Sequence, residues 1–243
     1  MRNNSSKVLL TLFLVTISMM VIPFISSCGK QGTINPTESK IQYQVLNLSY
    51  DVLPVYLYVN FLKQGNTYSY PSASGYFDLN TIDTPFQIRS AATASVTNLL
   101  RIDSSRLNRN TKYSLYIVGT RKNNDLSYLF TVDTSTIPPI GKGKIRFVNA
   151  APTVAGTSDQ GLNLAANGTN AFRQQKYKSV SNYIEIPAGV YNFQVSGSNP
   201  PNGIIKELKR TTINDGGLYT LYTYGLAGRV DTAAFGFAIL TNR

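Results

Sequence analysis

Two halves of the chain repeat the same pattern, and this repeat limits the possible folds more than any other sequence feature. Tyr113–Gly119 reads YSLYIVG and Tyr219–Gly225 reads YTLYTYG, near the end of each half. Further matching pairs are Val45–Asn47 with Phe147–Asn149, Leu57–Asn60 with Leu164–Asn167, and Tyr76–Leu79 with Tyr183–Ile186. A repeat of roughly a hundred residues is too long for a solenoid unit and is the size of a sandwich domain. We therefore expect two copies of one domain.

The boundary between the copies is marked by residues 134–143, which combine a proline pair with two glycines. This composition predicts a short, stiff linker. Domain 1 is expected to span residues 41–133 and domain 2 residues 144–243. Tyr, Thr, Val, Ile and Phe are plentiful and turn residues recur at short intervals, which is typical of many short strands.

The expected fold class is all-β, with two tandem immunoglobulin-like antiparallel β-sandwich domains and no helix longer than a single turn. Seven strands are expected in domain 2, at Lys144–Asn149, Leu162–Asn167, Tyr183–Ile186, Val190–Val195, Ile204–Thr212, Leu218–Tyr224 and Ala234–Leu240. Both faces of Leu218–Tyr224 carry aliphatic or aromatic groups, which predicts a central strand. Paired cysteines and tryptophan are missing, so the domains are immunoglobulin-like at most.

The N-terminus has the layout of a secretory signal peptide, in residues 1–27. Arg2 and Lys7 precede an almost wholly apolar run from Val8 to Ile25. Ile25-Ser26-Ser27-Cys28 resembles the lipobox of bacterial lipoproteins, which implies cleavage before Cys28, a diacylglyceryl group on its thiol and an acylated N-terminus. An uncleaved membrane anchor and an ordinary signal peptide with an incidental free thiol are the alternatives. Residues 28–40 are polar and are expected to form a flexible tether.

This resemblance also implies a cellular location. Gly29 follows the cysteine where an aspartate commonly signals retention in the inner membrane, so the lipid-anchored chain is expected in the outer membrane of the cell envelope. The leaflet stays open between the periplasmic and the surface face. The net charge of +11 falls only to about +9 once the signal peptide is removed, so the folded part is distinctly basic.

Motifs in the second half resemble a bacterial envelope domain of unknown function, DUF4397. They are the strand Ile145–Pro152 ending in VNAAP, the Asn167-Gly168 turn, the segment Tyr183–Tyr191 with its IPAG turn, and Tyr219–Tyr222. The first half matches in part, because Val45–Ser49 departs from the motif after the asparagine. The resemblance implies secreted or lipid-anchored β-sandwich modules, often in tandem, and brings no functional residues.

The residue types exclude most catalytic chemistry. The chain has no histidine and one cysteine, which removes histidine bases, the commonest metal ligand and any thiol nucleophile other than Cys28. The acids are scattered and match no metal-binding loop. We therefore predict a protein that is not an enzyme, with no catalytic residue, no metal site and no cofactor.

Basic residues cluster more than acids do. Arg173, Lys176 and Lys178 form a candidate basic binding patch, because such clusters attract acidic polysaccharide or phosphorylated headgroups. The alternative is that they are solvated loop charges that keep the domain soluble. The predicted function is a non-catalytic envelope protein that binds or scaffolds a glycan or a partner protein, and not nucleic acid. A purely structural spacer without a specific ligand is the alternative function.

Overall fold

The computed structural model describes residues 41–79, 85–92, 97–102, 107–152, 159–198 and 204–243. Strands and turns make up this part of the chain. Within these ranges no helix has the length and apolar character needed to cross a bilayer. The signal peptide, Cys28 and the tether lie outside the described residues, so these sequence-based expectations stay predictions.

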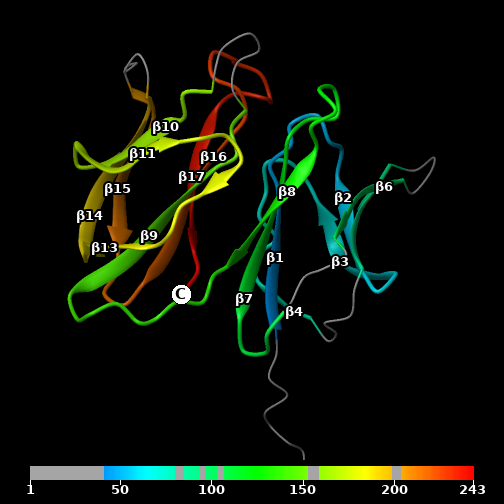
Figure 1. Ribbon diagram of the computed structural model, residues 1–243, viewed down its shortest axis with the longest axis horizontal. Coiled ribbons are helices and arrows are strands. Elements are labelled where there is room, and N and C mark those ends of the chain that lie inside the picture. The colour runs from blue at the N-terminus through cyan, green and yellow to red at the C-terminus, as the bar shows by residue number, and fades with distance from the viewer. Residues whose placement is uncertain (1–40, 80–84, 93–96, 103–106, 153–158, 199–203) are drawn as a thin grey trace, which may run out of the picture. The chain divides into compact units, whose positions relative to one another are not determined.

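The first half of the described chain forms two facing sheets, called A and B (Figure 1). Their strands are β1 (Ile41–Asn47), β2 (Val55–Val59), β3 (Leu62–Tyr68), β4 (Phe77–Leu79), β5 (Phe86–Ser90), β6 (Asn98–Ile102), β7 (Lys112–Val118) and β8 (Ser127–Val132). Sheet A has the order β4-β1-β7-β8, and sheet B has the order β3-β2-β5-β6. The two sheets make the first β-sandwich.

The second half forms two further sheets, called C and D (Figure 1). Their strands are β9 (Lys142–Asn149), β10 (Leu162–Ala166), β11 (Thr169–Gln175), β12 (Ser179–Val180), β13 (Ile184–Pro187), β14 (Gly189–Gly197), β15 (Ile204–Ile213), β16 (Leu218–Tyr224) and β17 (Gly236–Thr241). Sheet C has the order β12-β9-β16-β17, with β13 also pairing β9, and sheet D has the order β11-β10-β14-β15.

The strand order of sheets C and D repeats that of sheets A and B. β9 takes the place of β1, β10 that of β2, and β16 that of β7, so the repeated sequence segments lie on equivalent strands. Each of the seven strands expected in domain 2 overlaps an observed strand, and β16 is central, between β9 and β17. The alternation of side chains was sufficient to find these strands.

The expectation of purely antiparallel sheets is wrong for sheets A and C. β1 runs parallel to β7, and β9 runs parallel to β16, in both cases over six residue pairs. Side chains alternate with the same period in parallel and antiparallel strands, so the pattern carries no information on direction. The parallel pairing needs a long crossover, and the intervening strands of each sandwich supply it.

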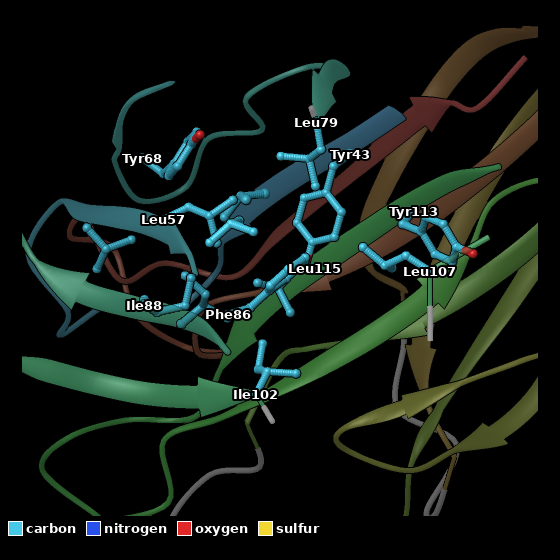
Figure 2. Close-up of a cluster of buried hydrophobic side chains, with 14 of the residues drawn as sticks. Tyr43, Leu57, Tyr68, Leu79, Phe86, Ile88, Ile102, Leu107, Tyr113 and Leu115 are labelled. Atoms are coloured by element: carbon cyan, nitrogen blue, oxygen red, sulfur yellow. The ribbon is translucent and has the colours of Figure 1, made fainter. Parts of the chain in front are cut away.

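Each sandwich has its own apolar core, which fixes the direction of every side chain on the strands. Tyr43, Leu57, Phe86, Ile88 and Leu115 are fully buried between sheets A and B, where Figure 2 shows them converging. The core between sheets C and D contains the equivalent set Ile145, Leu164, Phe193, Val195 and Leu221. Because side chains alternate along a strand, the neighbours of the inward residues point away from the core.

Two repeated residues have the same structural task in both sandwiches. The Tyr113 hydroxyl accepts a hydrogen bond from the backbone N–H of Asn108 at 2.7 Å, and the Tyr219 hydroxyl accepts one from Asn214 at 3.0 Å. Both phenols therefore tie the start of a central strand to the turn five residues upstream. This contact gives the turn N–H a hydrogen-bond partner within the sandwich.

A third apolar cluster joins the two sandwiches. Leu46, Tyr116 and Val118 of sheet A pack against Val148 and Tyr222 of sheet C. β8 ends at Val132 and β9 begins at Lys142, so the connecting segment overlaps the predicted linker and the first two residues of β9 lie inside it. The two sandwiches are thus joined by side-chain packing as well as by the chain.

Candidate functional site

The three residues of the predicted basic patch have different surroundings. Arg173 lies exposed on edge strand β11, and Lys176 and Lys178 lie in the turn that follows it. Lys176 donates to the backbone carbonyl of Asp159. The ammonium of Lys178 forms an ion pair with Asp125 of the first sandwich at 3.2 Å and donates to its carbonyl oxygen. Lys178 is therefore engaged in the contact between the sandwiches.

A different group of aromatic and basic side chains gathers on the outer face of sheet B. Val55, Leu57 and Val59 point into the core and are fully buried, so Tyr56 and Tyr58 between them point outward and are half-buried. The strands beside β2 add basic and amide side chains to the same face. We call this group the tyrosine–cation face, and its residues are Tyr56, Tyr58, Lys63, Gln87, Arg89 and Arg101.

The cations of this face cover the tyrosine rings. The Lys63 ammonium lies 3.7 Å from the centroid of the Tyr56 ring, and the Arg89 guanidinium carbon lies 4.1 Å from that of Tyr58. In the strand register Arg89 stands opposite Tyr56 and Lys63 opposite Tyr58, so each cation reaches diagonally to its ring. Each contact stabilises the pair by about 0.5–1 kcal/mol at an exposed site. The rings and cations therefore form one surface.

Gln87 fixes the orientation of Arg89. Its side-chain oxygen accepts hydrogen bonds from Arg89 Nε at 3.1 Å and from Nη2 at 2.5 Å. Gln87 is itself buried and paired in register with Tyr58 and Arg101. A guanidinium held in this way keeps donors for a carboxylate or sulfate in a planar fork.

The electrostatic character of this face is positive. The four strands of sheet B carry Lys63, Arg89 and Arg101 and contain no aspartate or glutamate. A surface of one sign attracts ligands of the opposite sign over about one Debye length, roughly 8–10 Å at ordinary ionic strength. The arrangement is suited to an anion that also offers an apolar ring face.

Sheet D provides an internal comparison, because its framework matches that of sheet B. Leu57 pairs with Ile88 as Leu164 pairs with Val195, and all four side chains are fully buried. The outward positions differ. In the second sandwich the residues at the positions of Tyr56, Tyr58, Lys63, Arg89 and Arg101 are Asn163, Ala165, Asn170, Ser196 and Glu207.

This comparison of the two sandwiches shows which residues the fold requires and which only change the surface of sheet B. The second sandwich keeps the inward residues and the amide, Gln194 in place of Gln87, but carries none of the face's aromatic rings or cations at the equivalent positions. The fold therefore does not require them. The tyrosine–cation face is an added property of the first sandwich.

A second polar group lies buried between the sandwiches, and it is an ion pair in a closed network. Arg146 of β9 pairs with Asp133, which follows β8, and both side chains are almost completely buried. Arg146 also donates to Thr220 Oγ1 at 2.8 Å and to the Val132 carbonyl at 2.9 Å. The Asp133 carboxylate accepts further hydrogen bonds from the hydroxyls of Tyr76, Ser114 and Thr131. We call this group the joint network.

The joint network extends to the end of sheet C. Asn242 donates from Nδ2 to the Tyr76 hydroxyl at 2.8 Å and accepts from Thr220 Oγ1 at 2.7 Å. Burial, followed by the repulsion of Asp133, holds the pKa of Tyr76 well above its usual range, so its phenol stays a donor. These bonds link residues of both sandwiches, which makes the joint network structural.

The aspartates and glutamates of the described part of the chain form no group of three that could hold a metal ion. The residues that gather on sheet B are nitrogen donors, an amide and aromatic rings, and none of them is a carboxylate that could ligate a metal ion. The arrangement is suited to non-covalent recognition.

The tyrosine–cation face and the joint network were not predicted from the sequence. The signal for the face was present in Val55–Val59, where tyrosines occupy each outward position, and in the alignment of these tyrosines with Asn163 and Ala165. The joint network joins residues from distant strands of two sandwiches. No spacing in the sequence places Asp133 beside Tyr76 and Asn242.

Two sandwiches with the same strand order and a buried joint define a tandem β-sandwich protein. A family model described as "Domain of unknown function (DUF4397)" matches residues 42–158. This match runs from β1 through β9, so it covers the first sandwich and only the start of the second. The motifs noted in the sequence lie mainly in the second half, and a separate match there is not shown. A search of curated proteins finds no match.

Proposed function

We propose that this protein is a non-catalytic envelope protein that binds an acidic glycan through the tyrosine–cation face. The observation that carries the proposal is the contrast between the two sandwiches. They share one framework, and at the matched outward positions only the first sandwich has aromatic rings and cations.

The proposed binding has two components. The carboxylates of an acidic glycan pair with Lys63 and with the oriented guanidinium of Arg89, which offers two parallel donors. A sugar ring lies against the face of Tyr56 as the flexible Lys63 side chain swings from this ring toward a carboxylate, while Gln87 holds Arg89 over Tyr58. A flat sheet face with a repeated ring and cation is suited to an extended polymer rather than to a small molecule.

The location belongs to the same proposal. We propose that a lipid on Cys28 anchors the chain in the outer membrane and that residues 28–40 tether the folded part.

The fold relation is also part of the proposal. The hydrogen bonds of Tyr113 and Tyr219 support an immunoglobulin-like fold, because a phenol that bonds the backbone a few residues upstream is the tyrosine corner of that fold.

The experiment is retention of the full chain on an immobilised acidic polysaccharide, polygalacturonate, across a salt series. The test variant carries Tyr58→Ala and Arg89→Ser, the residues of the second sandwich at these positions. We expect about tenfold weaker retention, which corresponds to about 1.4 kcal/mol. Arg173→Ser removes one positive charge from exposed β11 and is the matched control.

The outcomes separate three cases. Weaker retention of the double variant with an unchanged Arg173→Ser supports the proposal. The reverse result assigns binding to the patch of Arg173, Lys176 and Lys178 and overturns the tyrosine–cation face. Absence of retention of the wild-type chain at low salt overturns acidic-glycan binding altogether.

The joint network favours a second candidate function, that of a structural spacer. A buried ion pair and an apolar cluster hold the sandwiches together, and a spacer needs such a fixed connection. If the wild-type chain shows no retention but loses its fixed domain arrangement when Arg146 is replaced, measured by small-angle scattering, the spacer is the better description.

A further inference from the structure

The turn between β2 and β3 exposes two apolar side chains in a strained conformation. Asn60 and Phe61 form a two-residue loop between Val59 and Leu62, and both have positive φ, 46° and 64°. Phe61 is 57% exposed and Leu62 is 65% exposed. A bulky aromatic residue at positive φ is a conformational outlier. We call Phe61 and Leu62 the hairpin tip.

The second sandwich shows that this strain is unnecessary for the turn. Its equivalent loop is Asn167-Gly168, also with two positive φ values, 49° and 80°. Asparagine followed by glycine is the favoured sequence for such a turn, because glycine adopts positive φ without cost. The first sandwich therefore keeps an exposed phenylalanine where glycine fits better, and strain of this kind points to a function at the surface.

The hairpin tip lies at the end of the first sandwich where β1 begins. Val59 pairs with Phe86, the first residue of β5, and Ile41 pairs with Leu79, the last residue of β4. Since a short segment connects β4 to β5, the start of β1 and the hairpin tip share one end of the sandwich. The chain that leads from the proposed lipid on Cys28 would join the first sandwich at this end.

Charge and apolarity agree with a membrane surface. Lys63 follows the tip directly, and no strand of sheet B carries an acidic residue. The linker between the sandwiches adds Ile140, which is 97% exposed. Since the backbone of Asp133 bonds that of Lys112 at the start of β7, the linker begins at the same end of the fold as Ile41. Exposed apolar tips flanked by lysine are suited to the interface of an anionic bilayer.

We propose that the hairpin tip inserts into the interfacial region of an anionic lipid bilayer and seats the first sandwich on the membrane. Phe61 and Leu62 enter the headgroup boundary, and Lys63 pairs with lipid phosphates. The contact goes beyond glycan binding, uses different side chains apart from Lys63, and relies on the proposed anchor to hold the sandwich near the bilayer.

The chain contains no tryptophan, so Phe61→Trp introduces a single reporter. The full chain is reconstituted into vesicles of phosphatidylcholine and phosphatidylglycerol, with and without brominated acyl chains. We expect a blue-shifted emission that loses about half of its intensity to brominated lipid, because interfacial side chains reach only roughly 5–10 Å into the bilayer. Leu62→Trp is the second variant, since Leu62 lies outside the positive-φ turn.

Val230→Trp is the control, because Val230 is a fully exposed apolar residue in the loop between β16 and β17. Its emission should stay red and unquenched. The inference is overturned if both tip variants behave like this control, or if a blue shift appears on adding polygalacturonate without lipid. Flotation of the wild-type chain with neutral vesicles reports the anchor separately, and a chain that fails to float also overturns seating.

Discussion

Removal of the Arg146 guanidinium should lower the free energy of unfolding more than removal of any exposed charge. The side chain donates hydrogen bonds to Asp133, Thr131, Thr220 and the Val132 carbonyl. The first three of these residues are buried. Arg146→Met keeps most of the apolar stem and removes all of the donors. The Asp133 carboxylate then stays buried without its cation.

The magnitude follows from the burial of both partners. The side chains of Arg146 and Asp133 are 4% and 0% exposed. Breaking such a pair from one side costs about 3–5 kcal/mol. Asp133 retains hydroxyl donors from Tyr76, Ser114 and Thr131, which offset part of the loss. We expect Arg146→Met to lower the free energy of unfolding by about 3 kcal/mol, a large share of the roughly 5–15 kcal/mol of a typical domain.

The assay is urea unfolding of the full chain, followed by circular dichroism of the sheets. Lys142→Met is the matched control, because Lys142 lies on the same strand and pairs with Glu185 at 3.2 Å in an exposed position. Its loss should cost less than about 1 kcal/mol. Arg146→Met combined with Asp133→Asn should recover at least about 1 kcal/mol, since the neutral amide no longer requires a cation. If the two single variants differ by less than 1 kcal/mol, the buried pair does not stabilise the joint.

Three further predictions concern stability. Tyr43→Phe removes a buried hydroxyl that has no hydrogen-bond partner in the described part of the chain and should leave the unfolding free energy unchanged or raise it by up to about 1 kcal/mol; a loss in urea unfolding would reveal a hidden partner. Gly225→Ala should cost more than about 1 kcal/mol, because Gly225 has a φ of 68° and an added Cβ would overlap the Ala234 carbonyl; an unchanged melting temperature would contradict this. Burial raises the pKa of Tyr68 and Tyr222 to about 12, above the value of about 10 in the unfolded chain. The folded state therefore binds more protons above pH 10, and stability should be complete below that pH and fall as the pH rises through 12, which tyrosinate absorbance and unfolding at each pH would test.

The sequence was sufficient to locate most strands because burial on one face leaves a period of two. β16 was expected to be central on this basis, and it lies between β9 and β17. β11 was missed because TNAFRQQ is an edge strand in which Phe172 is the single buried side chain. An edge strand with so few apolar residues looks like a polar loop.

The candidate sites were harder to predict for two different reasons. The tyrosine–cation face depends on which residues of β2, β3 and β5 are neighbours, and strand register is set by long-range packing. The joint network depends on contacts between sandwiches, where Arg146 looks like an ordinary charge in an apolar strand. The patch of Arg173, Lys176 and Lys178 was found by proximity in sequence, which does not report that Lys178 reaches Asp125.

The parallel pairing of β1 with β7 has a consequence for the order in which the chain can fold as it is synthesised. β1 is the first strand to emerge, yet it is central in sheet A, and its side chain Gln44 bonds Ser114, 70 residues later. The second sandwich has a contact of similar sequence separation, because Arg146 bonds Thr220 across 74 residues. Such distant contacts slow folding and leave strand edges open in the meantime. Neither sandwich can therefore complete its central sheet until its last two strands have been synthesised, so β1 stays without its partner until β7 follows, and β9 until β16 follows.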